Sequence, residues 1–429
     1  MTEPERADSS TLSLLRDQPD FRRYWAALGL SNMGDWIQTV AGGWLITRLT
    51  DSATVIGAVT SAVTLPIMGL MLMGGVLADR HDRRKIMLTT QSLLCLVTLG
   101  GAAVVAMDQV SLPLVCLWFL LIGALVAFNA PSEQALLAQL VPPRQLQTAV
   151  GLFAASFSAS QLVGTALAAT LLGVGALHWL FLANGLSFFP LIIVLLIVRP
   201  KARVPPPARS AEQGTLREGL RYAWGHRHLR ALLMANALVT VCVYPFCKVF
   251  LPIYVKTILK GSEFELGHIM FGMGAGAFLG SLLISRVARR VYGMTLIVTY
   301  GCVSLSLVGL SFATTLGMAL AFTVLLGFAI SLAYGLTQTL LQVASEDRLR
   351  GRVLSFSELM QLGAPPLAAL AMGALVDGLQ FPSALRVAAF VFLIPTTVWL
   401  ASARLSELPV HDFVTDALLP EALPNKQEN

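Results

Sequence analysis

The sequence predicts an all-α, polytopic membrane protein with twelve transmembrane helices in two pseudo-symmetric six-helix halves. Three observations carry this prediction: an apolar composition, twelve apolar segments of membrane-spanning length, and one long polar linker after the sixth. The chain has 429 residues, of which 55% are hydrophobic and 13% charged, and its mean hydropathy is +0.71. A soluble domain is about 25% charged, so this composition excludes a water-soluble protein and also a disordered chain.

Twelve segments are long enough to cross a bilayer, because a hydrocarbon core of about 30 Å takes about 20 mainly apolar residues. The predicted spans cover residues 24–48, 54–78, 86–107, 111–131, 146–172, 177–198, 230–256, 265–287, 294–313, 316–341, 353–376 and 384–403. The polar segment before the first span lacks the short apolar core and the cleavage site of a signal peptide. We therefore expect the first apolar segment to remain in the protein as a span.

A polar, basic and proline-rich linker divides the spans six and six. We expect an N-terminal half at residues 1–198, a cytoplasmic linker at 199–229 and a C-terminal half with a polar cytoplasmic tail at 230–429. Three apolar residues of the linker recur at helical spacing and predict a short amphipathic helix on the membrane surface. They are Leu216, Leu220 and Trp224.

The basic residues predict the orientation of the chain. With the N-terminus in the cytoplasm, 25 of the 30 Lys and Arg residues fall in cytoplasmic segments. Basic residues are enriched on that side of membrane proteins, so we expect a multi-pass protein of the cell inner (plasma) membrane with both termini in the cytoplasm. The same bias accounts for the net charge of +6, and we expect no nucleic-acid partner.

The sequence carries no motif for a metal, a cofactor or catalysis. The five cysteines lie in apolar segments without a CxxC pair, and the six histidines lie outside the span centres. Neither HExxH nor the phosphate-binding GxxxxGK[ST] occurs. We expect no metal, no cofactor and no enzymatic activity.

The connection between the second and third spans carries the most distinctive motif, GGVLADRHDRRK at residues 74–85. Gly75 would allow its span to approach a neighbouring helix closely. Asp79 can accept hydrogen bonds or lie at a helix N-terminus, where the helix dipole favours an anion. A degenerate copy, GSLLISRVARR at residues 280–290, ends the eighth span and supports two related halves.

This motif resembles the loop 2–3 signature of the major facilitator superfamily, and the resemblance covers about residues 14–405. Asp82 stands where that signature usually has Gly. Four further stretches resemble the group that contains the bacterial enterobactin exporter and macrolide efflux proteins. They are FRRYW at 21–25, SNMGD at 31–35, NAP at 129–131 and RGRV at 350–353. The resemblance implies a major facilitator fold that works by alternating access, and it favours export.

The resemblance also implies a gate at the cytoplasmic face. Asp79 would pack near Arg352 and Val353 when the cavity faces outward, and Arg83 would pair with Glu133 at the inner end of the fourth span. The other gating candidates are Gly75, Arg80, Arg84 and Arg350.

Asp35 is the strongest candidate for proton coupling. It follows Tyr24 by eleven residues, which places it about 16 Å along the span, near the midplane. An ionisable side chain there costs about 2.5–3.5 kcal/mol and is therefore a functional candidate. Because burial disfavours the charged form, Asp35 suits proton uptake and release. Two other roles of Asp35 stay open: it could contact a cationic substrate, or it could form a structural hydrogen bond to a neighbouring helix.

Polar stripes mark the predicted substrate cavity. A polar stripe on an apolar helix faces water or a ligand more readily than lipid. The candidates are Asn32 and Gln38 in the first span, Asn236, Thr240, Tyr244 and Lys248 in the seventh, and Ser331, Tyr334 and Gln338 in the tenth. Lys248 would contact an anionic substrate group or reach the outer interface. We expect Glu358 in the eleventh span to pair with Arg350 or Arg352.

Together these features predict a secondary transporter that exports a bulky amphipathic small molecule, either a siderophore or a drug, in exchange for protons. We expect it to function as a monomer in the lipid bilayer. Two alternatives stay open: a carrier of lysophospholipid or another metabolite, and a transporter-like receptor without turnover.

Overall fold

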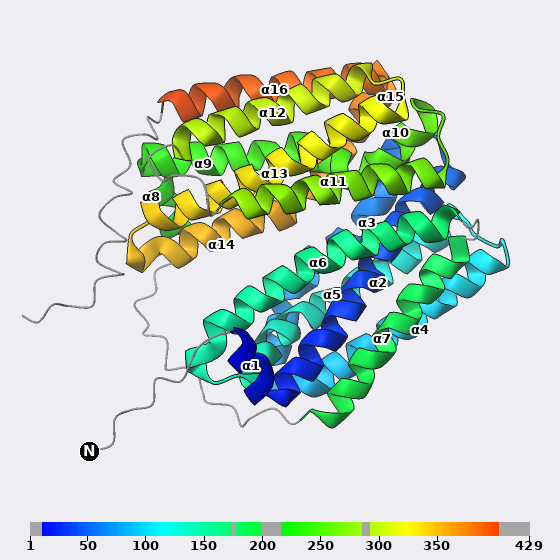
Figure 1. The fold of residues 1–429 in the computed structure, drawn as a ribbon, viewed down its shortest axis with the longest axis vertical. Helices are drawn as coiled ribbons and strands as arrows, with labels where there is room; N and C mark the ends of the chain where they lie inside the picture. The colour runs from blue at the N-terminus through cyan, green and yellow to red at the C-terminus, as the bar shows by residue number, and fades with distance from the viewer. Residues whose placement is uncertain (1–10, 174–176, 199–215, 285–291, 403–429) are drawn as a thin grey trace, which may run out of the picture.

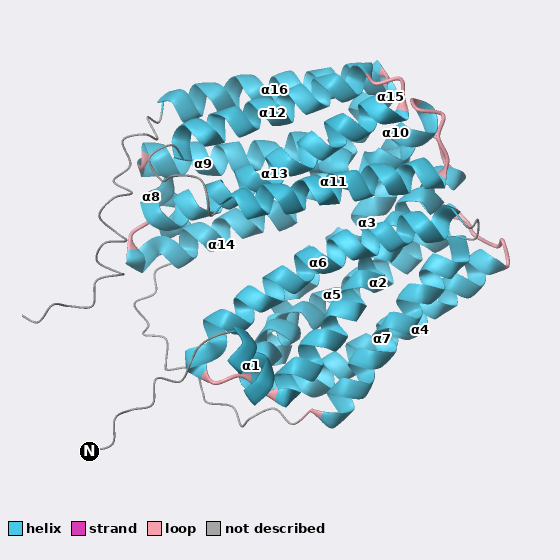
Figure 2. Cartoon of the chain, viewed as in Figure 1, coloured by secondary structure: helices cyan, strands magenta, loops and turns pink. Residues whose placement is uncertain are grey.

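The computed structural model describes residues 11–173, 177–198, 216–284 and 292–402. All regular secondary structure in these ranges is helical (Figure 2). The first helices are α1 (Thr11–Asp17), α2 (Pro19–Leu49), α3 (Ala53–Arg80), α4 (Arg83–Ala106), α5 (Leu112–Leu140), α6 (Leu146–Gly173) and α7 (Leu177–Ile197). In Figure 1 they form one group, which lies beside a second group made by the described helices that follow.

The second group begins with the short helix α8 (Leu216–Gly225), where the sequence predicts an amphipathic helix. It continues with α9 (Arg227–Leu238), two π-helical turns (Val239–Val243 and Phe246–Phe250), α10 (Leu251–Thr257), α11 (Glu263–Ile284), α12 (Tyr292–Phe312), α13 (Leu316–Ala344), α14 (Asp347–Gly363), α15 (Pro365–Leu379) and α16 (Phe381–Ser402). We call the end of the bundle that holds α1 and α8 the linker end. The opposite end, which holds α10 and the connection between α2 and α3, is the far end (Figure 1).

Eleven helical segments of the described chain are long and apolar enough to cross a membrane. Each coincides with one of the last eleven predicted spans, and two of them, Arg227–Thr257 and Leu349–Leu379, combine several elements. The first predicted span is α2, whose 31 residues extend about 46 Å at 1.5 Å per residue. Polar residues lower its hydropathy, but it packs inside the bundle against α6 and α7. The predicted all-α, polytopic fold class is confirmed.

Helices that cross the bundle touch through glycines, but Gly75 is not one of them. An added Cβ at Gly75 would meet no atom within 4 Å, whereas a Cβ at Gly74 would lie 2.3 Å from the carbonyl oxygen of Ala127 in α5. Because neighbouring residues on a helix point about 100° apart, the expected close approach occurs one residue earlier. Gly280, which begins the degenerate copy of the motif in α11, does make a close approach, with its added Cβ 2.3 Å from the carbonyl oxygen of Phe328.

Asp82, the departure from the family pattern, caps a helix. It is the N-cap of α4, and its carboxylate accepts a hydrogen bond from the backbone N–H of Arg84 at 3.0 Å. A carboxylate at this position satisfies one of the free N–H groups of the first helical turn and complements the helix dipole. Asp82 therefore starts the third span sharply after the loop.

The two groups of helices meet along α3 with α15 and α6 with α11. Close to the far end, α3 and α15 approach backbone to backbone, since a Cβ added to Gly57 would lie 2.7 Å from the carbonyl oxygen of Ala369. The Ser61 hydroxyl also donates to the carbonyl oxygen of Pro366 at 3.2 Å. In Figure 1 the two groups lie close together at the far end and diverge toward the linker end.

Candidate substrate and proton site

Asp35 lies near the middle of α2 and is accessible to solvent. Its carboxylate accepts a hydrogen bond from the side-chain amide of Asn184 in α7, with a nitrogen–oxygen distance of 3.4 Å. The same amide donates to Gln38 Oε1 at 2.8 Å, and the Ser187 hydroxyl donates to Asn184 Oδ1 at 3.1 Å. All these partners are uncharged. A proton or a cation could therefore neutralise Asp35 without breaking an ion pair.

Gly34 makes the contact between α2 and α7 possible. A Cβ at this position would lie 2.1 Å from Ser187 Oγ and 2.3 Å from Asn184 Oδ1. Any larger residue would push α7 away and separate Asp35 from Asn184. The neighbouring candidate Asn32 is half-buried on the same helix.

A second polar cluster in the first group of helices surrounds Asn129, from the NAP stretch of α5. The Asn129 amide donates to Glu133 Oε2 at 3.1 Å, and the Thr90 hydroxyl of α4 donates to Asn129 Oδ1 at 2.9 Å. Tyr24 of α2 donates its hydroxyl to the backbone carbonyl of Glu133 at 3.4 Å. The cluster ties α2, α4 and α5 together at half-buried Glu133.

The gating candidates at the linker end hold their own half together. Arg83 donates to the carbonyl oxygen of Ala135 at 3.2 Å and lies 3.6 Å from Asp79 in an ion pair. The expected pairing of Arg83 with Glu133 is not formed, because the guanidinium reaches the backbone two residues further on. Arg84 donates to the carbonyl oxygens of Leu195 and Leu196 at the end of α7, where a cation complements the helix dipole. Arg80 is exposed.

Arg350 and Arg352 stay within the second group of helices. Arg352 forms an ion pair with Glu218 of α8 at 3.1 Å, and Arg350 donates to the carbonyl oxygen of Gln342 at 2.8 Å. The expected pairing of Glu358 with either arginine is wrong. Its carboxylate instead accepts from Gln338 Nε2 at 2.7 Å and from the Tyr334 hydroxyl at 3.3 Å.

The stripe expected on the seventh span is broken by the two π-helical turns. Asn236 and Thr240 are buried, at 4% and 0% exposure, whereas Tyr244 is half-buried and Lys248 is exposed. A π-helical turn inserts one extra residue, so a spacing of four no longer keeps one face. Proline has no N–H to donate along the helix, and Pro245, beside these turns, is the signal in the sequence.

Two of the stripe residues nonetheless lie with the tenth span around one small cavity. Tyr244 and Asn236 line it together with Tyr300 and Tyr334. Asn236 also donates its amide to the Ser357 hydroxyl at 3.1 Å. Lys248 Nζ lies 5.1 Å from the centre of the Tyr244 ring. Of the tenth-span candidates, Tyr334 is exposed, while Ser331 and Gln338 are half-buried.

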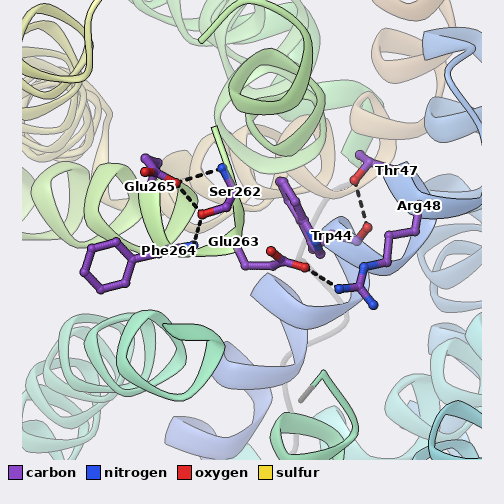
Figure 3. Close-up of polar contacts among 7 residues, drawn as sticks. All are labelled: Trp44, Thr47, Arg48, Ser262, Glu263, Phe264 and Glu265. Atoms are coloured by element: carbon purple, nitrogen blue, oxygen red, sulfur yellow. Dashed lines mark hydrogen bonds and ion pairs between the residues drawn. The ribbon is translucent and has the colours of Figure 1, made fainter. Parts of the chain in front are cut away.

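At the far end, charged side chains join the two groups of helices. Figure 3 shows Arg48, at the end of α2, reaching Glu263 at the start of α11 beside Trp44. Lys256 of α10 pairs with Asp51 at 2.8 Å and donates to the carbonyl oxygen of Thr47.

Asp377 of α15 adds the densest of these far-end contacts. Its carboxylate accepts from the Ser52 hydroxyl at 2.9 Å and from the backbone N–H groups of Ala53 at 2.8 Å and Thr54 at 3.0 Å. A carboxylate from one group of helices thus caps the N-terminus of α3 in the other.

The described helices form a polytopic bundle with a fold of the major facilitator type. Its fold matches a solved D-xylose-proton symporter with a TM-score of 0.69 over 90% of this chain and 97% of that one, at 12% sequence identity. A likeness at this identity shows the fold alone.

Sequence comparison then gives the family. The transmembrane secretion effector family matches residues 9–427, so the chain belongs to that family of the major facilitator superfamily and is a transporter, not an enzyme. The multidrug efflux pump Tap of Mycobacterium tuberculosis is 26% identical over 84% of this chain and 87% of that protein. Macrolide efflux protein A of Streptococcus pyogenes is 26% identical over 68% of this chain and 73% of its own length.

Sequence reasoning missed two residues of these clusters. Asn184 was absent from the candidates although it is the only amide side chain in its span, next to Gly185. Asp377 was also absent, and the signal was an acidic residue before Gly378 at the end of a span. In both cases the residue type was visible, but the partner helix was not.

Proposed function

We propose that this transporter exports bulky amphipathic small molecules of the drug type from the cytoplasm by alternating access, in exchange for protons. The linker end would face the cytoplasm of the cell inner membrane, since that end holds the excess of basic residues. Support for drug substrates comes from the relatives, which are a multidrug and a macrolide efflux pump. The resemblance to the enterobactin exporter group keeps a siderophore as the competing substrate.

Asp35 carries the proposed proton exchange. It is an accessible carboxylate at mid-membrane depth whose side-chain partner, Asn184, is neutral. Water contact at one face would allow the group to lose its proton, and closure of that face would favour its protonated form. Proton uptake by Asp35 from one side and its release on the other would then drive the export of the substrate.

The test is drug flux in proteoliposomes with an imposed pH gradient. We expect Asp35→Asn to lower gradient-driven erythromycin and ethidium transport at least tenfold, since the amide cannot take up a proton. Asp108→Asn, an exposed carboxylate in the loop after α4, is the matched control and should keep wild-type flux. Full transport by the Asp35 variant would contradict proton coupling at this residue.

Further measurements on the same transporter distinguish the alternative substrates and functions. Wild-type protein that binds drug but moves none across the membrane would indicate a receptor without turnover. If deletion of the gene lowers the secretion of an iron chelator while drug resistance is unchanged, the siderophore version replaces the drug version. Flux of lysophospholipid without drug flux would favour the lipid carrier.

A further inference from the structure

Glu358 occupies an unusual position for a carboxylate. It follows residue 353, where the predicted eleventh span begins, by five residues, which is about 8 Å along the helix. That depth is inside a hydrocarbon core of about 30 Å, in the half nearer the linker end. Glu358 is also exposed. An ionisable side chain at this depth faces the bundle interior or a water-filled space, because exposure to lipid is costly.

Glu358 forms no ion pair in the part of the chain that the structure describes. Its two hydrogen-bond donors, Gln338 and Tyr334, are neutral. The arginines nearest in sequence are engaged elsewhere, with Arg352 on Glu218 and Arg350 on the backbone of Gln342. The carboxylate is therefore held in place without being neutralised.

The surroundings are polar and aromatic. Gln338 Nε2 bridges Glu358 and the Tyr334 hydroxyl, at 2.7 and 3.1 Å, and so links the carboxylate to the tyrosine. Tyr334 is 38% exposed and shares a cavity with Tyr244. The ring of Tyr244 already has the ammonium of Lys248 above it. That leaves the exposed Tyr334 ring, and a carboxylate beside such a ring attracts organic cations through its charge and through the ring quadrupole.

We propose that Glu358, with the Tyr334 ring beside it, binds a positively charged group of the transported molecule and selects bulky organic cations. This inference rests on the proposed function, because it takes this face of the C-terminal half to meet the substrate. It assigns the two carboxylates different tasks. Asp35 exchanges protons in one half, and Glu358 recognises the substrate in the other.

The experiment is equilibrium binding to the purified full-length protein in detergent, without a pH gradient. The probes are tetraphenylphosphonium, a permanent cation, and triphenylphosphine oxide, a neutral molecule of similar bulk. Glu358→Gln removes the charge but keeps an oxygen that can accept from Gln338. Glu346→Gln is the matched control, because Glu346 is an exposed carboxylate just before the same helix.

We expect Glu358→Gln to weaken tetraphenylphosphonium binding at least tenfold and to change triphenylphosphine oxide binding less than twofold, while the control changes neither. Three results would overturn the proposal: cation affinity of the Glu358 variant within twofold of wild type, equal losses for both probes, or a wild-type protein that does not bind the cation. Because no gradient is present, failure of proton coupling at Asp35 leaves this test unaffected. Conversely, normal proton-driven flux with unchanged cation binding would overturn only the role of Glu358.

Discussion

The far end and the linker end of the molecule use their charged residues in different ways. At the far end, Asp377, Lys256 and Glu263 each reach from the second group of helices to the first. At the linker end, the contacts of Arg84 and Arg352 stay within one group. Charged side chains thus connect the two groups of helices at the far end, whereas at the linker end they make contacts within one group.

If the transporter works by the proposed alternating access, this difference indicates which contacts change between its states. Alternating access requires the halves to separate at one end while they are joined at the other. The far-end contacts must break when that end opens, so they set the free energy of this state relative to its opposite. The linker-end contacts can persist through the whole cycle because they do not cross between the groups.

Removing Asp377 should change the population of the open far end more than any other substitution considered below. Asp377→Ala deletes three hydrogen bonds to the start of α3, and a hydrogen bond to a charged group contributes about 1.5–3 kcal/mol. Since 1.4 kcal/mol corresponds to about tenfold in an equilibrium, we expect the open far end to become at least tenfold more populated. Maleimide labelling of Thr47→Cys in a cysteine-free background measures this, because Thr47 is 0% exposed.

The control for Asp377 is Asp108→Asn, in a loop outside the contact between α3 and α15, which should leave the labelling rate unchanged. An unchanged labelling rate in Asp377→Ala would mean that apolar packing between α3 and α15 alone joins the far end.

Breaking the pair of Lys256 with Asp51 should have a smaller effect. Asp51 is 81% exposed and Lys256 36% exposed, and exposed ion pairs contribute about 0.2–1 kcal/mol. We expect Asp51→Asn to raise the Thr47→Cys labelling rate by up to about fivefold in low salt. At 1 M salt the Debye length is about 3 Å, so the variant and the wild type should then label at similar rates.

The two far-end contacts should differ in their dependence on salt concentration. The effect of Asp377→Ala should survive at high salt, because its bonds to backbone N–H groups are short-range. If both variants lost their effect at 1 M salt, the far end would be held by long-range charge attraction rather than by the cap on α3.

The spans could be predicted from the sequence because length and hydropathy are local properties. The exception is α2, the first predicted span, which is not among the eleven membrane-spanning helices of the described chain because residues such as Asp35 and Arg48 lower its hydropathy. The partners of the polar residues could not be predicted in this way. Reasoning along one helix paired Glu358 with Arg350, whereas its donors come from α13.

Small rotations explain the other differences between prediction and structure. Gly74 rather than Gly75 meets α5, because one residue changes the direction of a side chain by about 100°. The π-helical turns around Pro245 rotate the seventh span, so Asn236 is buried while Lys248 is exposed. Hydropathy averages over a window and cannot resolve such shifts. The candidate site was therefore predictable as a set of residue types and not as a set of contacts.

Releasing α8 from α14 should have the smallest effect on the opening of the far end. It therefore tests whether the contacts at the two ends act independently. Arg352→Ala removes the pair with Glu218 where the two helices pack closely, since a Cβ on Gly219 would lie 2.6 Å from Arg352 Cβ. We expect hydrogen exchange of the α8 amides to rise severalfold, because the helix loses its docking contact. The Thr47→Cys labelling rate should stay within twofold of wild type.

Arg221→Ala, on the exposed side of α8, is the matched control for Arg352→Ala and should change neither measurement. If Arg352→Ala raised far-end labelling as much as Asp377→Ala, the linker-end contact would be part of the switch between states. The inference that linker-end contacts only stabilise their own group of helices would then be wrong, because a contact within one group would control how the two groups meet.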